Sequence, residues 1–256
     1  MTVFSSIGAA KTRRMGRIFA PDGKSVFAAV DHAAYISPSP PLGRTMLDIA
    51  EGGPDGVLAT WHIAREYADA FARTGLVLRV DGGTTELGGF PEGDVSTLLY
   101  QVEDAVRIGA DCIVLLVFTG QHDEHLSLSR LGKVVREAEQ YGLPVMAEVI
   151  PGGWGRAVEW NIENVALGAR IAAEFGADIV KTVSPTAPEE FARVVDACPV
   201  PVVALGGPKT DSEDDVVALA AGVTAAGAAG VAFGRNVWGS PDPAALIRRL
   251  SQAVHG

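Results

Sequence analysis

The stretch Ala177-Asp178-Ile179-Val180-Lys181-Thr182-Val183 is apolar and β-branched apart from its acid and one lysine near the end. Such a run is typical of a buried strand. An ammonium is costly in a low-dielectric interior, and a lysine buried there can act as a free amine that attacks a carbonyl and forms a Schiff base. Lys181 is therefore the predicted nucleophile. Two other interpretations stay open, that it extends to the surface or that it pairs with a carboxylate.

Seven further stretches share this strand pattern and alternate with amphipathic segments. The eight predicted strands cover residues 25–31, 56–60, 76–81, 111–118, 144–150, 178–183, 201–206 and 230–234. The predicted helices cover residues 96–108, 126–140, 161–174, 188–197, 212–226 and 242–254, with a weaker one at 45–53. Eight strands alternating with helices in about 250 residues favour an α/β fold of the (β/α)8 TIM barrel type. A doubly wound sheet is the competing fold.

The composition fits one barrel domain over residues 1–256, with a short N-terminal extension of about residues 1–20. No apolar run reaches the length of a membrane span, and the first residues lack a signal-peptide pattern. The net charge of −10 argues against a nucleic-acid or anionic-membrane surface. The two cysteines, Cys112 and Cys198, indicate reduced buried thiols, and a cytoplasmic protein is expected.

Polar residues stand where several predicted strands end. In a TIM barrel the chemistry lies at the C-terminal ends of the strands. The first strand ends in Asp31 and His32, the fifth carries Glu148 and the sixth carries Lys181. Side chains alternate along a strand, so Asp31, Glu148 and Lys181 can all point inward. A carboxylate beside the lysine would hold it in place and relay protons.

Glycines end the last two predicted strands. Gly206 and Gly207 lead into Lys209, and Gly234 is followed by Arg235. Glycines let backbone N–H groups approach an anion, and an arginine supplies a fork of donors. These loops are also the usual phosphate site of the fold, so we expect a phosphorylated substrate here. Ordinary turn glycines would explain either motif alone.

Together these motifs resemble the DeoC/LacD aldolase superfamily. The resemblance rests on residues 30–32, 178–181, 205–209 and 230–238, and its nearest branch is the archaeal-type class I fructose-bisphosphate aldolases with their relatives, the aminodideoxyheptulosonate synthases and the autoinducer-2 thiolase. It implies a barrel in which Lys181 forms the Schiff base with a dihydroxyacetone-phosphate-like donor, Asp31 assists, and Gly206, Gly207, Gly234 and Arg235 hold the phosphate. It also implies that no cofactor or metal is needed, and that the chain forms a homo-oligomer.

One departure from that family concerns the end of the fifth strand. The family usually reads Tyr-Pro-Arg-Gly there, and this chain has Ile150, Pro151, Gly152 and Gly153. The family's proton-transfer phenol is therefore absent, and Glu148 or His32 must replace it. The lost arginine, at Gly152, also alters the acceptor side. We expect an acceptor other than glyceraldehyde 3-phosphate, for example aspartate semialdehyde in a biosynthetic pathway.

Further candidates are weaker. The pair His122 and His125 has a spacing that a metal site could use, although a solvated loop is the simpler interpretation. Trp154 could contact substrate from its loop, and Tyr35 could substitute for the missing phenol. Lys209 adds charge to the phosphate site or faces solvent.

The sequence thus predicts an aldehyde-lyase that acts on a phosphorylated small molecule and an aldehyde acceptor. Transaldolase or acyl-transfer chemistry on the same lysine is the nearest alternative. A phosphosugar isomerase or binding protein, in which Lys181 merely pairs with Asp31, is an alternative of another class.

Overall fold

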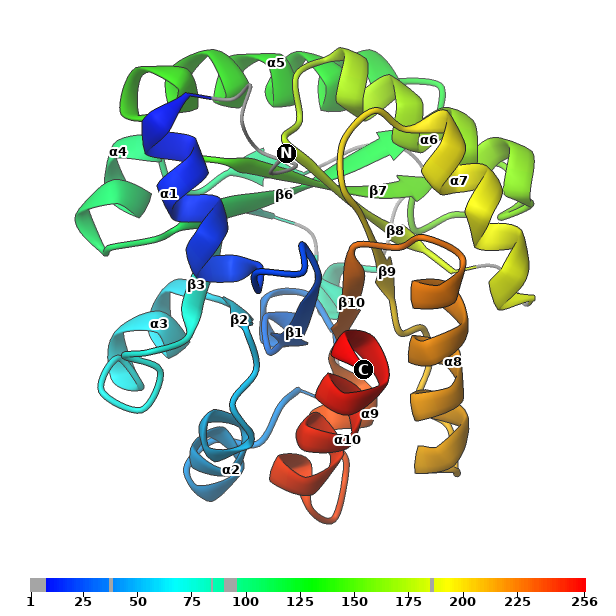
Figure 1. Cartoon of the computed structure of the whole chain (residues 1–256). Coiled ribbons are helices and arrows are strands. Elements are labelled where there is room, and N and C mark those ends of the chain that lie inside the picture. The colour runs from blue at the N-terminus through cyan, green and yellow to red at the C-terminus, as the bar shows by residue number, and fades with distance from the viewer. Residues whose placement is uncertain (1–7, 37–38, 84, 90–95, 185–186) are drawn as a thin grey trace.

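A closed barrel of eight parallel strands forms the centre of the computed structural model, which describes residues 8–36, 39–83, 85–89, 96–184 and 187–256 (Figure 1). Around the barrel the strands follow the order β1-β10-β9-β8-β7-β6-β3-β2. Their bounds are β1 (Ser25–Ala29), β2 (Gly56–Ala59), β3 (Gly75–Arg79), β6 (Cys112–Thr119), β7 (Val145–Pro151), β8 (Ile179–Val183), β9 (Val202–Leu205) and β10 (Gly230–Phe233). The predicted TIM barrel and its eight strands are confirmed.

Helices surround the strands and shield their outer faces (Figure 1). They are α2 (Arg44–Gly52), α3 (Trp61–Glu66), α4 (Val102–Arg107), α5 (Glu124–Tyr141), α6 (Ile162–Glu174), α7 (Phe191–Ala197), α8 (Glu213–Ala225), α9 (Arg235–Trp238) and α10 (Pro243–His255). Short 3-10 turns lie at His32–Ala34, Glu86–Gly88 and Pro188–Glu190.

One predicted helix is wrong at its start. Residues 96–108 were expected to be helical throughout, but Thr97–Leu98 form strand β5, which pairs antiparallel with β4 (Asp81–Gly82). Helix α4 begins only after Gln101, whose backbone N–H donates to Asp104 Oδ2 at 2.9 Å in a capping box. The local cap and the strand pairing therefore override the helical periodicity.

The inside of the barrel is an apolar column. It contains Phe27, Leu58, Val77 and residues at equivalent positions of the other strands. Along each strand these inward-facing side chains alternate with outward-facing side chains. Met15, Ile18 and Phe19 pack against this column at the N-terminal end of the barrel. They come from helix α1 (Ala9–Ile18) and the residue after it, which lie in the stretch predicted as an N-terminal extension.

Polar contacts fix α1 at the N-terminal end of the barrel. Lys11 is 3% exposed, and its Nζ donates to both oxygens of Asp178 at 2.9 Å. Asp178 precedes β8 and also accepts from the N–H of Val145 at the start of β7. Arg14 donates to the carbonyl of Ala110, just before β6. With this end closed, the opposite end is the place for a site.

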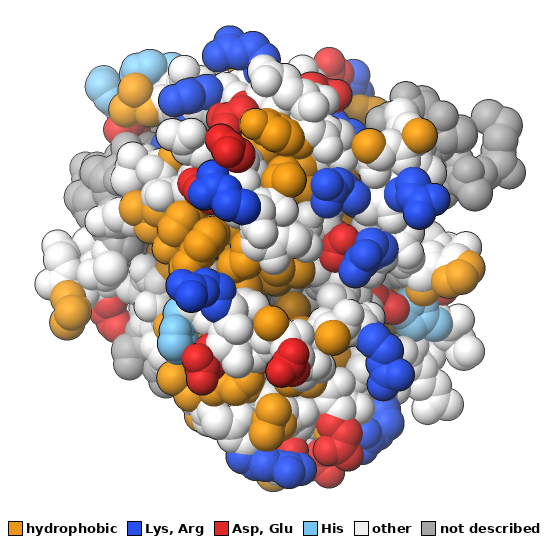
Figure 2. Space-filling view, turned by 90° about the vertical axis from the view of Figure 1, so that its left-hand side faces the viewer, with side chains coloured by type: hydrophobic (Ala, Val, Ile, Leu, Met, Phe, Trp, Pro, Cys, Tyr) orange, Lys and Arg blue, Asp and Glu red, His pale blue; other side chains and the backbone are white. Residues whose placement is uncertain are grey.

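The surface carries interspersed charges. Figure 2 shows one face on which basic and acidic side chains alternate, with hydrophobic side chains gathered between them. Exposed large hydrophobic residues in the described part of the chain include Leu42, Leu47, Leu126, Leu167 and Phe175. Periodicity and exposure alone do not show what would cover them, so the homo-oligomer stays a prediction. None of the described helices combines the length and the hydropathy needed to cross a membrane.

Candidate active site

Lys181 and Glu148 form the centre of the site. They occupy the same register position on the neighbouring strands β8 and β7, and both point into the barrel. Lys181 is 4% exposed, and its Nζ lies 2.6 Å from Glu148 Oε1. The lysine therefore neither extends to the surface nor pairs with Asp31. It pairs with Glu148, the inward-facing carboxylate of the neighbouring strand β7.

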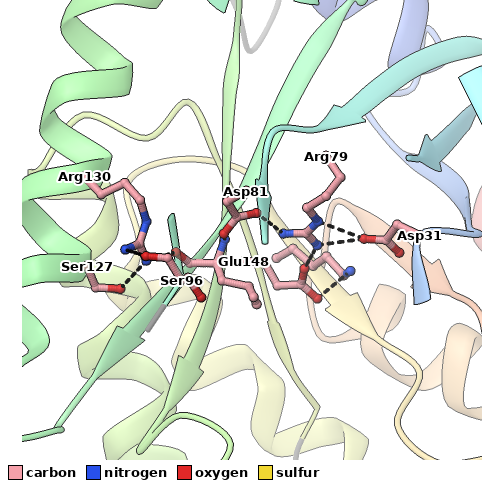
Figure 3. A network of polar contacts seen from close by, with 9 residues as sticks. Asp31, Arg79, Asp81, Ser96, Ser127, Arg130 and Glu148 are labelled. Carbon is pink, nitrogen blue, oxygen red and sulfur yellow. Dashed lines mark hydrogen bonds and ion pairs between the residues drawn. The ribbon is translucent and has the colours of Figure 1, made fainter. Parts of the chain in front are cut away.

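Arg79 connects this pair to the rest of the site. Its guanidinium, on β3, contacts three carboxylates: Asp31 through Nε and Nη2 at 2.9 and 2.8 Å, Asp81 through Nη1 at 3.1 Å, and Glu148 through Nη2 (Figure 3). In the barrel order β1 and β7 lie on opposite sides, with β3 halfway between them. The planar fork of an arginine suits such a bridge, because several of its N–H donors can be used at once.

A second line of contacts holds Asp81 itself. Asp81 Oδ2 accepts from the N–H of Leu116 at 2.7 Å, and the carbonyl of Leu116 accepts from Arg130 Nη2 at 3.2 Å. Arg130 also donates to Ser127 Oγ (Figure 3). The same oxygen accepts from the N–H of Phe118. The ion cluster is thus tied to the backbone of β6 and to helix α5, so Arg79 has little freedom to move.

The charge on Glu148 follows from its two neighbours. Burial by itself would raise the pKa of this carboxyl, but Lys181 and Arg79 outweigh burial and lower the pKa to about 2. Burial raises the pKa of Asp81, and Arg79 opposes that shift. At neutral pH Glu148 is consequently an anion, and it lies between Lys181 and Arg79.

His32 and Tyr35 complete the wall beside Asp31. Burial lowers the pKa of His32, so its ring is neutral at pH 7. Its ring packs edge-on against Trp238, and its Nδ1 lies 3.8 Å from Asp31 Oδ1. The Tyr35 ring lies 5.3 Å from Arg79 Cζ, and burial raises the pKa of its phenol well above the ordinary value. Among the described residues its hydroxyl has no hydrogen-bond partner.

The predicted phosphate residues lie on the other side of Lys181, after β9 and β10. Gly207 has a φ of 63°, a conformation that favours glycine, and nothing lies within 4 Å of the space a side chain would fill. Arg235 Nη2 donates to the carbonyl of Gly207 at 2.9 Å. A Cβ on Gly234 would come within 2.3 Å of His32, so glycine is required there. The structure brings Gly206, Gly207, Gly234 and Arg235 into one cavity with Lys181.

Lys209 does not reach that cavity. Its Nζ donates to the carbonyl of Gly239 at 2.7 Å, and it lines a second, smaller cavity behind the loop. The residue that shapes the loop is Asn236, which was not foreseen. It accepts from the N–H of Thr210 at 2.9 Å and donates to the carbonyl of Pro208 at 3.2 Å.

The main cavity has a volume of about 370 Å³. Besides the charged residues it is lined by aromatic and aliphatic side chains, including Ile150, Trp154 and Trp160. Trp154 packs against Phe118 and Tyr35 at ring distances of 5.9 and 6.3 Å. A concave, mostly apolar pocket with a few converging charges is the usual form of a small-molecule site.

The histidine pair does not belong to this cavity. His122 and His125 are exposed at the start of α5 and do not line it. In the described part of the chain, His, Cys, Asp and Glu side chains form no group of three or more that could hold a metal ion.

Sequence reasoning missed Arg79, although a signal existed. The segment Leu76-Val77-Leu78-Arg79-Val80 is an apolar strand interrupted by one cation, as is the segment around Lys181. The same argument about a buried charge therefore applies to both residues. The sequence did not show which carboxylates would pair with Arg79, because Asp31, Asp81 and Glu148 come from three different places in the chain.

Comparisons with known proteins show the family of the chain. The family model described as "DeoC/LacD family aldolase" matches residues 28–240. The chain belongs to the DeoC/LacD aldolase family. The resemblance inferred from the motifs is thus confirmed, and so is the prediction of a class I aldolase as the enzyme class.

Its relatives include two kinds of enzyme. The class 1 fructose-bisphosphate aldolase of Thermoproteus tenax is 35% identical over 254 residues, which cover 96% of this chain and 95% of that protein. The 3-hydroxy-5-phosphonooxypentane-2,4-dione thiolase of an Enterobacter species is 32% identical over 245 residues, covering 94% of this chain and 80% of that one.

Solved structures of aldolases match the whole barrel. A structure of a Schiff-base-forming fructose-1,6-bisphosphate aldolase has a TM-score of 0.85 at 34% identity and covers 95% of this chain and 99% of its own. An archaeal fructose-1,6-bisphosphate aldolase, with its catalytic lysine covalently bound to the carbinolamine intermediate, has a TM-score of 0.84 at 33% identity and covers 96% and 100%.

Acid should remove the stability that Glu148 contributes. Its folded pKa of about 2 lies below the ordinary value of 4.5, so its contribution is present above the ordinary value and is lost as the pH falls from about 5 to about 2. The free energy of unfolding of the wild type should therefore fall more steeply over this range than that of Glu148→Gln, measured by urea denaturation. Equal slopes in the two proteins would contradict the ion cluster.

Removing Arg79 should destabilise the fold. Arg79→Met leaves Asp31, Asp81 and Glu148 buried around an apolar side chain, and breaking a buried ion pair from one side costs about 3–5 kcal/mol. Urea denaturation at pH 7 measures this loss, with Arg136→Met on the exposed surface of α5 as the control. A loss below about 1 kcal/mol would show that the bridge is unimportant.

Proposed function

We propose that this chain is a class I aldolase in which Lys181 forms a Schiff base with a dihydroxyacetone-phosphate-like donor. The observation that carries the proposal is a buried lysine, paired with Glu148 at 2.6 Å, that opens into the same cavity as Gly207 and Arg235. An amine, a carboxylate and an anion-binding loop are the groups that imine chemistry on a ketose phosphate requires.

The barrel order supports one orientation of the donor. Lys181 is on β8, with β9 and β10 on one side and β7 on the other. A phosphate bound by the N–H groups near Gly207 and by Arg235 would place the ketone toward Lys181 and leave the β7 side for the acceptor. Arg235 Nε has no hydrogen-bond partner among the described residues, and so retains a donor for an anion.

The chemistry follows from this placement. The Nζ lone pair adds to the donor ketone and gives a carbinolamine, which loses water to form an iminium ion. Loss of a proton from the neighbouring carbon gives an enamine, whose carbon attacks the acceptor aldehyde while the aldehyde oxygen takes up a proton. Water then hydrolyses the new iminium and releases both the product and the Lys181 amine.

Glu148 is the group in reach for these protons. Oε1 lies 2.6 Å from Nζ, so it can accept the proton that the ammonium must lose before attack. In the neutral carbinolamine the positive charge on Nζ is gone, and one of the two influences that lower the pKa of Glu148 goes with it. A proton that Glu148 has taken from the ammonium is therefore held more firmly in the carbinolamine, where it is needed to protonate the hydroxyl group that leaves as water. His32 and Asp31 lie along the same wall and are candidates for the remaining proton transfers.

The acceptor differs, we infer, from glyceraldehyde 3-phosphate. Ile150 lines the cavity with an apolar side chain where the family resemblance expects a phenol, and Gly152 stands where it expects an arginine. Aspartate semialdehyde stays a hypothesis for this acceptor. Tyr35 is the phenol that lines the cavity instead, but its buried hydroxyl has a strongly raised pKa and so keeps its proton at neutral pH.

The thiolase relative favours acyl transfer as the second candidate. That reaction would use the same lysine and cavity, so it differs in the group transferred and not in the nucleophile. A phosphosugar isomerase or binding protein would need no covalent bond to Lys181.

Covalent trapping separates these possibilities. Incubation with dihydroxyacetone phosphate and borohydride should give a reduced adduct on Lys181, detected by intact-protein and peptide mass spectrometry. Lys181→Met should give none, because no other amine lines the cavity among the described residues. The matched control Lys133→Met, on the exposed surface of α5, should label fully. If the wild type binds the donor but forms no adduct, the proposal fails.

A further inference from the structure

Arg156, like Arg235, is a cation of the same cavity that has no carboxylate partner among the described residues. It follows β7, in the loop before α6, and lines the cavity together with Lys181 and Arg235. Among the described residues its side chain has no hydrogen bond and no carboxylate within 4 Å. The family arginine is lost at Gly152, so Arg156 is not the residue that the motif would identify.

Arg156 is exposed, but its backbone is held by neighbouring contacts. Its φ is 51°, and it is the one residue other than glycine with a positive φ in the described part of the chain. Such a conformation costs about 1 kcal/mol or more and persists only where neighbouring contacts hold it. Here its N–H donates to the carbonyl of Gly153 at 3.2 Å, and the N–H of Ala157 donates to that of Gly152 at 3.0 Å.

An aromatic platform orients the guanidinium. Arg156 Cζ lies 4.2 Å from the centre of the Trp160 ring, and Trp160 Nε1 donates to the carbonyl of Pro151 at 2.8 Å. Stacking on a ring uses the face of the guanidinium and leaves its N–H edge available for hydrogen bonds. An arginine so held can bind a carboxylate or a phosphate through two parallel bonds.

Two of the cations in this cavity have no carboxylate partner among the described residues. Four cations among the described residues line the cavity. Arg79 and Lys181 contact carboxylates, whereas Arg156 contacts a tryptophan ring and Arg235 a backbone carbonyl. These two lie on opposite sides of β8, Arg235 after β10 and Arg156 after β7. The cavity is therefore charged to hold a molecule with an anionic group at each end and a reactive carbon between them.

We propose that Arg156 binds an anionic group, a phosphate or a carboxylate, at the end of the acceptor aldehyde remote from its carbonyl. The inference rests on the proposed function, since it takes Lys181 as the attachment point of the donor. It adds the residue, Arg156, that would select an acceptor with such an anionic group.

Paired aldehydes test the proposal. Succinic semialdehyde and butanal differ in a carboxylate, and glycolaldehyde phosphate and glycolaldehyde differ in a phosphate. With dihydroxyacetone phosphate as donor, kcat/KM for at least one anionic aldehyde should exceed that for its neutral partner by about ten-fold or more, the worth of one charge-assisted hydrogen bond. Arg156→Met should remove this difference and leave the neutral aldehydes unchanged, and Arg156→Lys should restore part of it. The pair that shows the effect identifies the anion.

Two controls keep this result separate from the proposed function. Borohydride trapping of the donor on Lys181 should proceed equally in Arg156→Met, because the donor phosphate is held on the other side of β8. Arg136→Met, an exposed arginine on α5, should not change the preference. A wild type that traps the donor but shows no preference for an anionic aldehyde overturns the role of Arg156, as does equal loss on anionic and neutral aldehydes. A wild type that traps no donor overturns the Schiff-base function itself.

Discussion

The contact between Arg79 and its three carboxylates is the constraint on which the site depends. Charged groups are costly inside a barrel unless they are paired and hydrogen-bonded. Arg79 and Lys181 balance most of the charge of Asp31, Asp81 and Glu148, and the guanidinium contacts carboxylates from both the β1 side and the β7 side of the barrel. One consequence is that Glu148 cannot turn away from Lys181 without losing its bond to Arg79. Lys181 and Glu148, the proposed nucleophile and proton acceptor, are therefore held together before any substrate arrives.

The order of strands in the barrel gives the Lys181–Glu148 pair different surroundings on its two sides. Strand β8 lies between the glycine-rich loops after β9 and β10 and the tryptophan-bearing loop after β7. An arginine on each side of Lys181, Arg235 on one and Arg156 on the other, distinguishes the two ends of the cavity, so the two halves of an aldol product would have different places. On the β7 side the cavity wall carries the apolar side chain of Ile150, which cannot transfer a proton as a phenol can.

Much of the fold could be predicted from the sequence, and the site only in part. The eight strands have strong apolar patterns, and the inward direction of Glu148 and Lys181 follows from alternation along a strand. The register that brings these two side chains side by side depends on pairing between strands, which local periodicity does not encode. Arg79 was missed because its partners are far apart in sequence, and Lys209 points away because Gly239 offers it a carbonyl. Helix α4 starts late because of its capping box.

A crystal structure of the borohydride-reduced complex with dihydroxyacetone phosphate tests the account most directly. The account predicts a covalent bond from Lys181 Nζ to the central carbon of the donor, with Glu148 still bonded to Arg79. It also predicts the phosphate at Gly207 and Arg235, and an open space beside Arg156. A donor phosphate bound at Arg156, or an adduct on another lysine, would contradict it.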